Sequence, residues 1–354
     1  MGVPPMPTVL IIPTGIGCQH GGFAGDGLPV ARLLAAASGC LVTHPNVLNA
    51  ASLYWPDARI HTTEGWALDR FCQGQLALRP HHRHCLGLLL DGALEPDLLE
   101  RHRQVAAAAR FSLGLSIGPE VVTPEPLGVC LEQGVSGMSW GGVNRVDVLL
   151  EAGHQLQRRG ATAVAVVTRF PDESPTSSLL QNYRHGRGVD ALAGAEAVIS
   201  HLLVRELGLP CAHAPAVRPL PLLSDVDPRA AAEELGYTFL PSVLVGLSRA
   251  PRLIPAAAAR MGDLLTHQVG ALVAPHGALG GPAVLAAAER ATPILAVHNP
   301  SQLEVTAEAL GLEGVIHVAN YQEAAGVVVS LREGLDPGAF QRPLGQTGPE
   351  PIRG

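Results

Sequence analysis

Short apolar runs alternate with helical segments along the chain, and this alternation constrains the fold more than any other feature. We predict strands at 8–13, 40–43, 86–90, 162–168, 242–247, 271–274 and 294–297, and helices at 28–38, 95–110, 144–158, 191–207, 228–235, 282–291 and 321–333. Strands that are separated by helices form parallel sheets with helices on both faces. We therefore expect an α/β protein with two Rossmann-like lobes and mostly parallel sheets.

The expected lobes are residues 1–125 and 126–335, followed by a frayed tail at 336–354 that is rich in Pro and Gly. The stretch 114–137 contains three prolines and little periodicity, so we place the crossover between the lobes there. Each lobe carries one glycine-rich loop after a predicted strand. We expect both loops to face a common cleft, because open parallel sheets bind ligands at the carboxyl ends of their strands.

Composition excludes several classes of protein. Of 354 residues, 47% are hydrophobic and 16% are charged, which excludes a disordered chain and suffices for a large core. The net charge of −7, without a basic cluster, argues against nucleic acid as a partner. No apolar run reaches the roughly 18 residues of a membrane span. Since the N-terminal residues also lack a signal-peptide pattern, we expect a cytoplasmic protein that does not bind membranes.

The chain contains no lysine, so all 24 of its basic residues other than histidine are arginine. This excludes pyridoxal phosphate, Schiff-base and P-loop chemistry, which need a lysine. The six cysteines form no C-x-x-C pair, which is unlike a zinc module. We predict no cofactor, although a divalent metal stays an open alternative.

The glycine-rich loop after the first predicted strand is the leading candidate site. Gly15 and Gly17 would bring backbone amides close to an anion at the start of the helix at 28–38, and Cys18, His20 and Asp26 would supply a nucleophile, acid or base. The alternative is a tight connection in which Asp26 caps the helix. A third glycine at the dinucleotide spacing is missing, so a nicotinamide site is not predicted.

Other candidate residues follow the remaining strands and the long loop at 170–190. Histidine would move protons, asparagine would orient the substrate, and glycine and arginine would bind an anion. These candidates are His44, Asn46, Asn49, Arg184, Arg187, His276, Gly280, Gly281 and Asn299. Structural alternatives stay open for several of them, such as an Asx turn at Asn46 and a helix cap at Asn49.

These residues favour an enzyme, performing group transfer or hydrolysis on a small phosphate- or carboxylate-bearing metabolite. One alternative is a non-catalytic binding or sensory protein that uses the same cleft. Another is a metal-dependent hydrolase that uses His20, Asp26, His44 and His276. A homo-oligomer is compatible with the sequence.

Four segments resemble a domain-of-unknown-function family of photosynthetic bacteria and plant plastids. They are PTGIGC-x-x-GG-x-AGD at 13–26, THPNVLNAASLYWP at 43–56, GVD-x-x-x-GAEAVISH at 188–201 and HNPSQLEVT at 298–306. The resemblance extends over residues 8–335. It implies no particular activity, because no reaction is assigned to that family.

Overall fold

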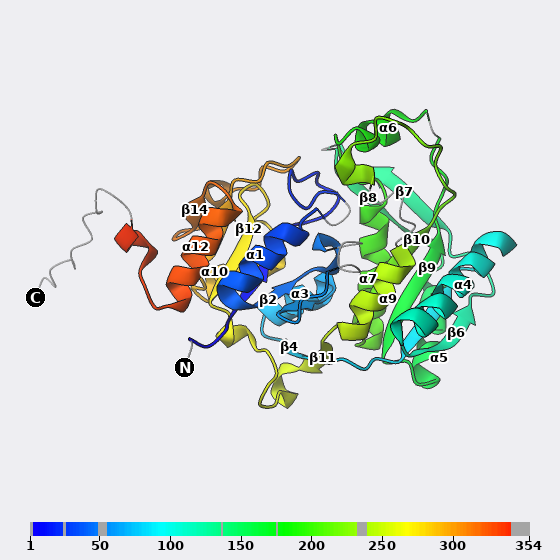
Figure 1. Cartoon of the computed structure of the whole chain (residues 1–354), viewed down its shortest axis with the longest axis horizontal. Coiled ribbons are helices and arrows are strands. Elements are labelled where there is room, and N and C mark those ends of the chain that lie inside the picture. Colours follow the sequence, from blue (N-terminus) through cyan, green and yellow to red (C-terminus); the bar gives the residue numbers. More distant parts are fainter. Residues whose placement is uncertain are drawn as a thin grey trace, which may run out of the picture.

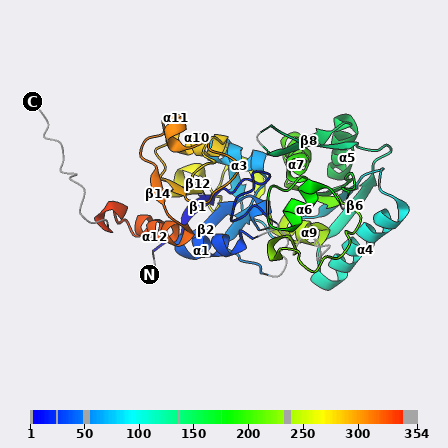
Figure 2. The ribbon, with the colours of Figure 1, turned by 90° about the horizontal axis from the view of Figure 1, so that it is seen from above.

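The computed structural model describes residues 3–23, 26–48, 55–135, 137–174, 176–231 and 239–340. Two sheets, each with helices on both faces, form two lobes that lie side by side (Figures 1 and 2). Every strand pair in these two sheets is parallel. The predicted α/β class with mostly parallel sheets is therefore confirmed.

The first lobe contains a six-stranded sheet in the order β14-β13-β12-β1-β2-β3. Its strands are β1 (Met6–Leu10), β2 (Gly39–Thr43), β3 (Ile60–Thr62), β12 (Ala271–Pro275), β13 (Ile294–Val297) and β14 (Ile316–Val318). This is the Rossmann order, in which β1 and β12 form the central pair where the strand order reverses.

Alternate residues of these strands enter two different cores, because successive side chains of a strand point to opposite faces. Leu10 and Val273 pack against α1 (Leu28–Ser38) and α12 (Tyr321–Arg332) on one face. Val9 and Leu272 pack against α3 (Gly65–Cys72) and α10 (Pro282–Glu289) on the other. The apolar runs thus form strands that are buried on both faces. The short helix α11 (Ala307–Leu310) lies between β13 and β14 in the chain.

The second lobe contains a four-stranded sheet in the order β10-β9-β5-β6. Its strands are β5 (Leu86–Leu90), β6 (Ile117–Val122), β9 (Ala163–Arg169) and β10 (Cys211–Ala216). One face packs against α4 (Pro96–Leu113) and α9 (Phe239–Arg249) and the other against α5 (Val146–Arg158) and α7 (Ala193–Leu207). A hairpin of β7 (Val129–Gln133) and β8 (Ser139–Val143) and the short helix α6 (Ser178–Arg184) complete this lobe.

The chain passes from the first lobe to the second after β4 (Leu76–Arg79) and returns at β11 (Arg252–Pro255). These two strands pair in an antiparallel ribbon, so both crossings lie side by side. The expected division at residue 125 does not follow the sheets, because β12 to β14 complete the sheet that begins with β1. The stretch 114–137 lies within the second lobe and contains β6 and β7.

The strand predicted at 242–247 is wrong, since these residues belong to helix α9. Periodicity cannot distinguish a short apolar run in a strand from one in a buried helix, and here Leu240, Leu244 and Leu247 pack at helical spacing into the core. The helix predicted at 228–235 lies partly outside the described residues, which omit 232–238. The expected tail lies outside them from residue 341 to residue 354. Among the described helices, none has the length and apolar composition needed to cross a membrane.

Candidate functional site

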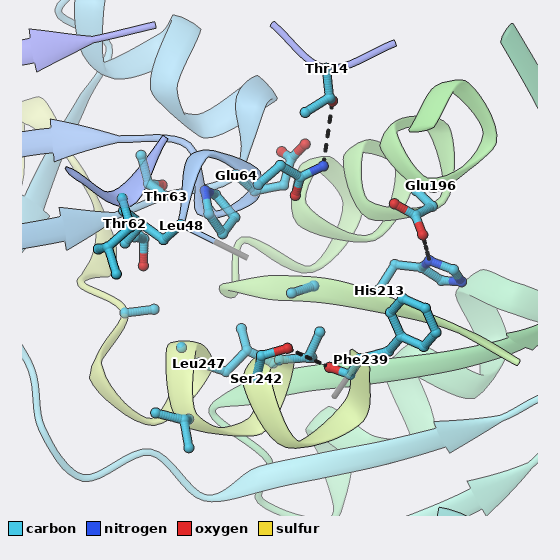
Figure 3. Close-up of a pocket in the computed structure, with 18 of the residues that line it drawn as sticks. Thr14, Leu48, Thr62, Thr63, Glu64, Glu196, His213, Phe239, Ser242 and Leu247 are labelled. Atoms are coloured by element: carbon cyan, nitrogen blue, oxygen red, sulfur yellow. Dashed lines mark hydrogen bonds and ion pairs between the residues drawn. The ribbon is translucent and has the colours of Figure 1, made fainter. Parts of the chain in front are cut away.

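A cleft lies between the lobes, where β3 at the edge of the first sheet faces β10 at the edge of the second (Figure 3). It encloses about 140 Å³. The polar residues that line the cleft on the side of the first lobe come from the loops that follow its strands. Those on the side of the second lobe come from β10, α7 and α9. The polar lining residues used below are Thr14, Asn46, Glu64, Glu196, His213 and Arg249.

Glu64 is a buried acid on the first lobe's side of the cleft, with 5% of its surface exposed. Its Oε2 accepts a hydrogen bond from the Trp66 amide at 2.8 Å, which caps α3. Its Oε1 lies 2.6 Å from Nδ1 of His201, on α7 of the second lobe. That nitrogen also donates to the carbonyl of Ala197 at 2.5 Å, and Glu64 Oε1 makes no hydrogen bond besides this ion pair. Burial lowers the pKa of His201, but Glu64, the Ala197 carbonyl and Asp69 together raise it by more, so the pKa lies above its ordinary value.

His44 lies beside this pair, because Gly65 packs against both His44 and His201. Burial lowers the pKa of His44 to about 4, and protonated His201 adds to the effect while Glu64 opposes it. Its Nδ1 accepts a hydrogen bond from the Asn46 amide at 3.2 Å. His44 is thus neutral at pH 7 and holds the loop after β2. Asn46 does line the cleft, where its side chain donates to Thr14 Oγ1 at 3.4 Å.

His213 is the buried base on the second lobe's side of the cleft. Its Nε2 lies 2.5 Å from Thr168 Oγ1, and its Nδ1 has no hydrogen-bond partner. Figure 3 shows Glu196 reaching from α7 toward this ring, with its Oε1 3.7 Å from Nδ1. Because Thr168 engages Nε2, Nδ1 is the ring atom that can exchange a proton with a ligand.

The first glycine-rich loop binds protein groups with most of its amides. The amides of Gly21 and Phe23 donate to Asp26, at 2.6 and 3.5 Å, and the His20 amide donates to Asn299 Oδ1 at 2.9 Å. Asn299 is fully buried and also donates to the carbonyl of His20 and to the Tyr321 hydroxyl. The amides of Gly21 and Phe23 thus donate to a carboxylate of the protein itself. Burial raises the pKa of Asp26, against the effect of these amides.

Cys18 does not suit the role of nucleophile. The side chain is fully buried, and burial together with the Asp26 carboxylate raises its pKa to about 12. The thiol is protonated at neutral pH, whereas the thiolate is the reactive form.

Gly15 and Gly17 form contacts between the lobes. Both have positive φ, and a Cβ at Gly17 would lie 2.7 Å from the carbonyl oxygen of Gly188. The Ser139 amide donates to the Gly15 carbonyl at 3.2 Å, and the guanidinium of Arg229 donates to the Gln19 carbonyl at 3.0 Å. The glycines let the loop after β1 lie directly against the second lobe.

The second glycine-rich loop also meets a carboxylate of the protein. Gly281 is the N-cap of α10, and the first amide after Pro282, that of Ala283, donates to Asp69 of α3. His276 lies at the end of β12 and stacks on His298, with ring centroids 5.1 Å apart. The segment 298–305 joins this loop to the first one, because Gln302 donates to Ile16 and Val305 to Gly277. Neither Gly280, Gly281 nor His276 lines the cleft.

The two loop arginines also lie away from the cleft. Arg184 is 1% exposed and donates to the carbonyl of Pro221 at 2.6 Å, so it holds the second lobe together. Arg187 is exposed. Asn49 lies outside the described residues.

The four candidate metal ligands lie in separate environments. His44 contacts Gly65, His276 stacks on His298, and His20 meets the ring of Tyr321 edge-on with centroids 6.0 Å apart. Within the described part of the chain, no group of three or more His, Cys, Asp and Glu side chains is arranged to hold a metal ion.

Glu64, His213 and Arg249 are not among the candidates predicted from the sequence. Glu64 caps a helix that was not predicted, and His213 lies in a strand whose pattern is obscured by Pro210 and Pro215. Glu196 lies within the quoted motif at 188–201, which is the one signal that could have pointed to it.

The fold and the cleft define an α/β protein with two Rossmann-like lobes and a cavity between them. The chain belongs to the family described as protein of unknown function (DUF3326), which matches residues 7–341. The predicted resemblance to an uncharacterised family is thus confirmed. A protein of Synechococcus sp., named as an uncharacterized lipoprotein, is 53% identical over 334 residues, covering 94% of this chain and 92% of the relative. No solved structure matches the chain.

Proposed function

We propose that this protein is an enzyme acting on a small carboxylate- or phosphate-bearing metabolite in the cleft between the lobes. One observation carries the proposal: two buried ionisable side chains line the same cleft from opposite lobes, Glu64, whose Oε1 contacts His201, and His213, whose Nδ1 makes no hydrogen bond and lies 3.7 Å from Glu196. Leaving a buried ring nitrogen without a hydrogen bond costs about 1–3 kcal/mol, so a bound ligand that pairs with His213 Nδ1 would recover that energy.

Glu64 and His213 would act as the acid–base groups of the reaction. Glu64 also raises the pKa of Cys211, which places it near β10, and Cys211 and His213 are on the same face of that strand. The two groups can therefore reach one ligand between them. Group transfer or hydrolysis needs proton movement of this kind.

Arg249 would meet the anionic part of the ligand. It ends α9 and lines the cleft with an exposed side chain, and a guanidinium suits a carboxylate or phosphate. Arg249 thus takes the role that the sequence predicted for Arg184 and Arg187.

The test is a ligand-stabilisation screen of carboxylated and phosphorylated metabolites, followed by calorimetry on the wild type and on Arg249→Gln, Glu64→Gln and His213→Gln. Arg249→Gln should weaken binding tenfold or more. The two acid–base variants should bind the anion but lose its conversion. Arg205→Gln, at an exposed position of α7, is the matched control. A ligand that binds but is never converted would instead favour a binding or sensory protein, and binding unaffected by all three variants would exclude this cleft.

We also propose a cytoplasmic location. The relative's name raises lipid attachment as the alternative. Attachment of a lipid to Cys18 would require removal of the residues before it. That removal would delete β1, which pairs with both β2 and β12. Cys40, Cys72 and Cys211 are buried as well. Fractionation of the source cells should recover the protein without detergent, and a membrane-bound form that carries lipid would contradict the proposal.

A further inference from the structure

A second cavity adjoins the cleft. It encloses about 100 Å³ within the second lobe, between α6, the segment 189–192 and the segment 217–220. Phe239 and Asp190 line both this cavity and the cleft, so the two spaces adjoin at these side chains. Figure 3 shows Phe239 at the start of α9, on the wall of the cleft.

The lining of the second cavity is mostly apolar. Its apolar members are Leu179, Leu180, Val189, Ala191, Leu192 and Val217. Its polar members interact mainly with other protein groups. The guanidinium of Arg218 pairs with Glu95 and Asp97, both at 3.3 Å, and Asp190 Oδ1 accepts from the Leu192 amide at 2.8 Å. Such a lining offers a ligand contact area and few hydrogen bonds.

We infer that the ligand of the cleft carries an apolar group, of about the size of a phenyl ring, which occupies this second cavity. An engineered apolar cavity of roughly 150 Å³ in another protein stays dry and binds benzene, and the cavity here is of the same order. The inference rests on the proposed function for the polar end of the ligand, which Glu64 and His213 would hold. The substrate class is then a small carboxylate or phosphate with an aromatic or short branched aliphatic arm.

The partial burial of Glu173 is consistent with this assignment. Glu173 lines the cavity, and burial raises the pKa of its carboxyl group. A protonated carboxyl group costs less free energy to place beside an apolar ligand than a charged carboxylate does.

The first test uses benzene as the probe and does not depend on the proposed function. Benzene should bind the wild type, as measured by the shift of proton resonances and by an increase in melting temperature. Ala191→Phe should abolish this binding, because the new side chain fills the cavity. Val217→Phe fills the cavity from the opposite segment and replaces Ala191→Phe in the test if that variant does not fold. Ala108→Phe, at an exposed position of α4, is the control and should bind benzene normally. Failure of benzene to bind the wild type, or equal binding to the filled variants, overturns the inference.

The second test compares propionate with 3-phenylpropionate by calorimetry. The phenyl ring should tighten binding about tenfold to a hundredfold, the effect of burying one aromatic side chain. Ala191→Phe should bring the two affinities together, whereas the control Ala108→Phe should leave the advantage of the phenyl ring unchanged. If 3-phenylpropionate kept its higher affinity over propionate in Ala191→Phe, the phenyl ring would bind elsewhere. That result would refute the connection between the cavities. Benzene binding without binding of either carboxylate would refute the proposed anion site and leave the cavity itself supported.

Discussion

The half-buried histidine His44 should make the stability of this protein fall steeply in mild acid. Its pKa is about 4 in the folded protein and roughly 6.5 in an unfolded chain. Between these values the unfolded chain binds more protons than the folded one, so the free energy of unfolding decreases as the pH falls. The contribution is fully present above about pH 6.5 and is lost as the pH falls through about 4. The whole difference corresponds to about 3 kcal/mol, and about 2.5 kcal/mol of it is lost by pH 4.5.

His44→Asn is the perturbation that isolates this effect. Asparagine cannot titrate, and its side-chain oxygen can replace His44 Nδ1 as acceptor for the Asn46 amide at the start of the short 3-10 helix Pro45–Val47. The free energy of unfolding of the wild type, minus that of the variant, should therefore be lower at pH 4.5 than at pH 7.5 by about 2.5 kcal/mol. Other titrating groups act equally on both proteins and cancel in the comparison.

The assay is urea unfolding at half-unit steps from pH 7.5 to 4.5, followed by fluorescence or circular dichroism. As the pH falls, the free energy of unfolding of the wild type should decrease by more than that of His44→Asn, while His317→Asn, at an exposed histidine, should run parallel to the wild type. If the free energies of wild type and His44→Asn ran parallel across this pH range, the pKa of His44 would be the same in the folded and unfolded chain, and the reasoning would fail.

Three further predictions concern the candidates from the sequence. Limited alkylation at neutral pH, read by mass spectrometry, should label the partly buried Cys85 and Cys130 before Cys18, and early labelling of Cys18 would contradict its environment. Gly17→Ala should destabilise the protein by more than Gly114→Ala in chemical denaturation. Both glycines have φ near +65°, but only at Gly17 would the added Cβ lie within 3 Å of another backbone, that of Gly188. Equal losses in unfolding free energy would mean that the contact with Gly188 does not constrain the lobes. Arg184→Ala should lower the unfolding free energy by about 1–3 kcal/mol, since it removes a buried donor, whereas Arg187→Ala should stay within about 0.5 kcal/mol. Equal effects of the two arginines would refute the buried position of Arg184.

The sequence by itself determined the class of fold and most of its central elements. The run at Leu86–Leu90 and the helix Leu28–Ser38 were predicted with the bounds that the structure has, because a continuous apolar run and a 3.6-residue period each admit few local structures. The alternation of such elements then requires a parallel sheet covered on both faces. Glycines after a strand were likewise identified as positions of special backbone conformation, as Gly15 and Gly17 are.

The tertiary structure decided what those positions do. Whether a backbone amide at a glycine-rich loop meets a ligand or a side chain depends on residues far away in the chain, and Asp69 reaches the start of α10 across more than 200 positions. The same holds for the cleft, since Glu64 follows β3 at the edge of the first sheet and His213 lies in β10 at the edge of the second, and only the packing of the two lobes brings them to one cavity. Local patterns encode the elements, whereas the site arises where the edges of two sheets meet, and no local pattern specifies which edges those are.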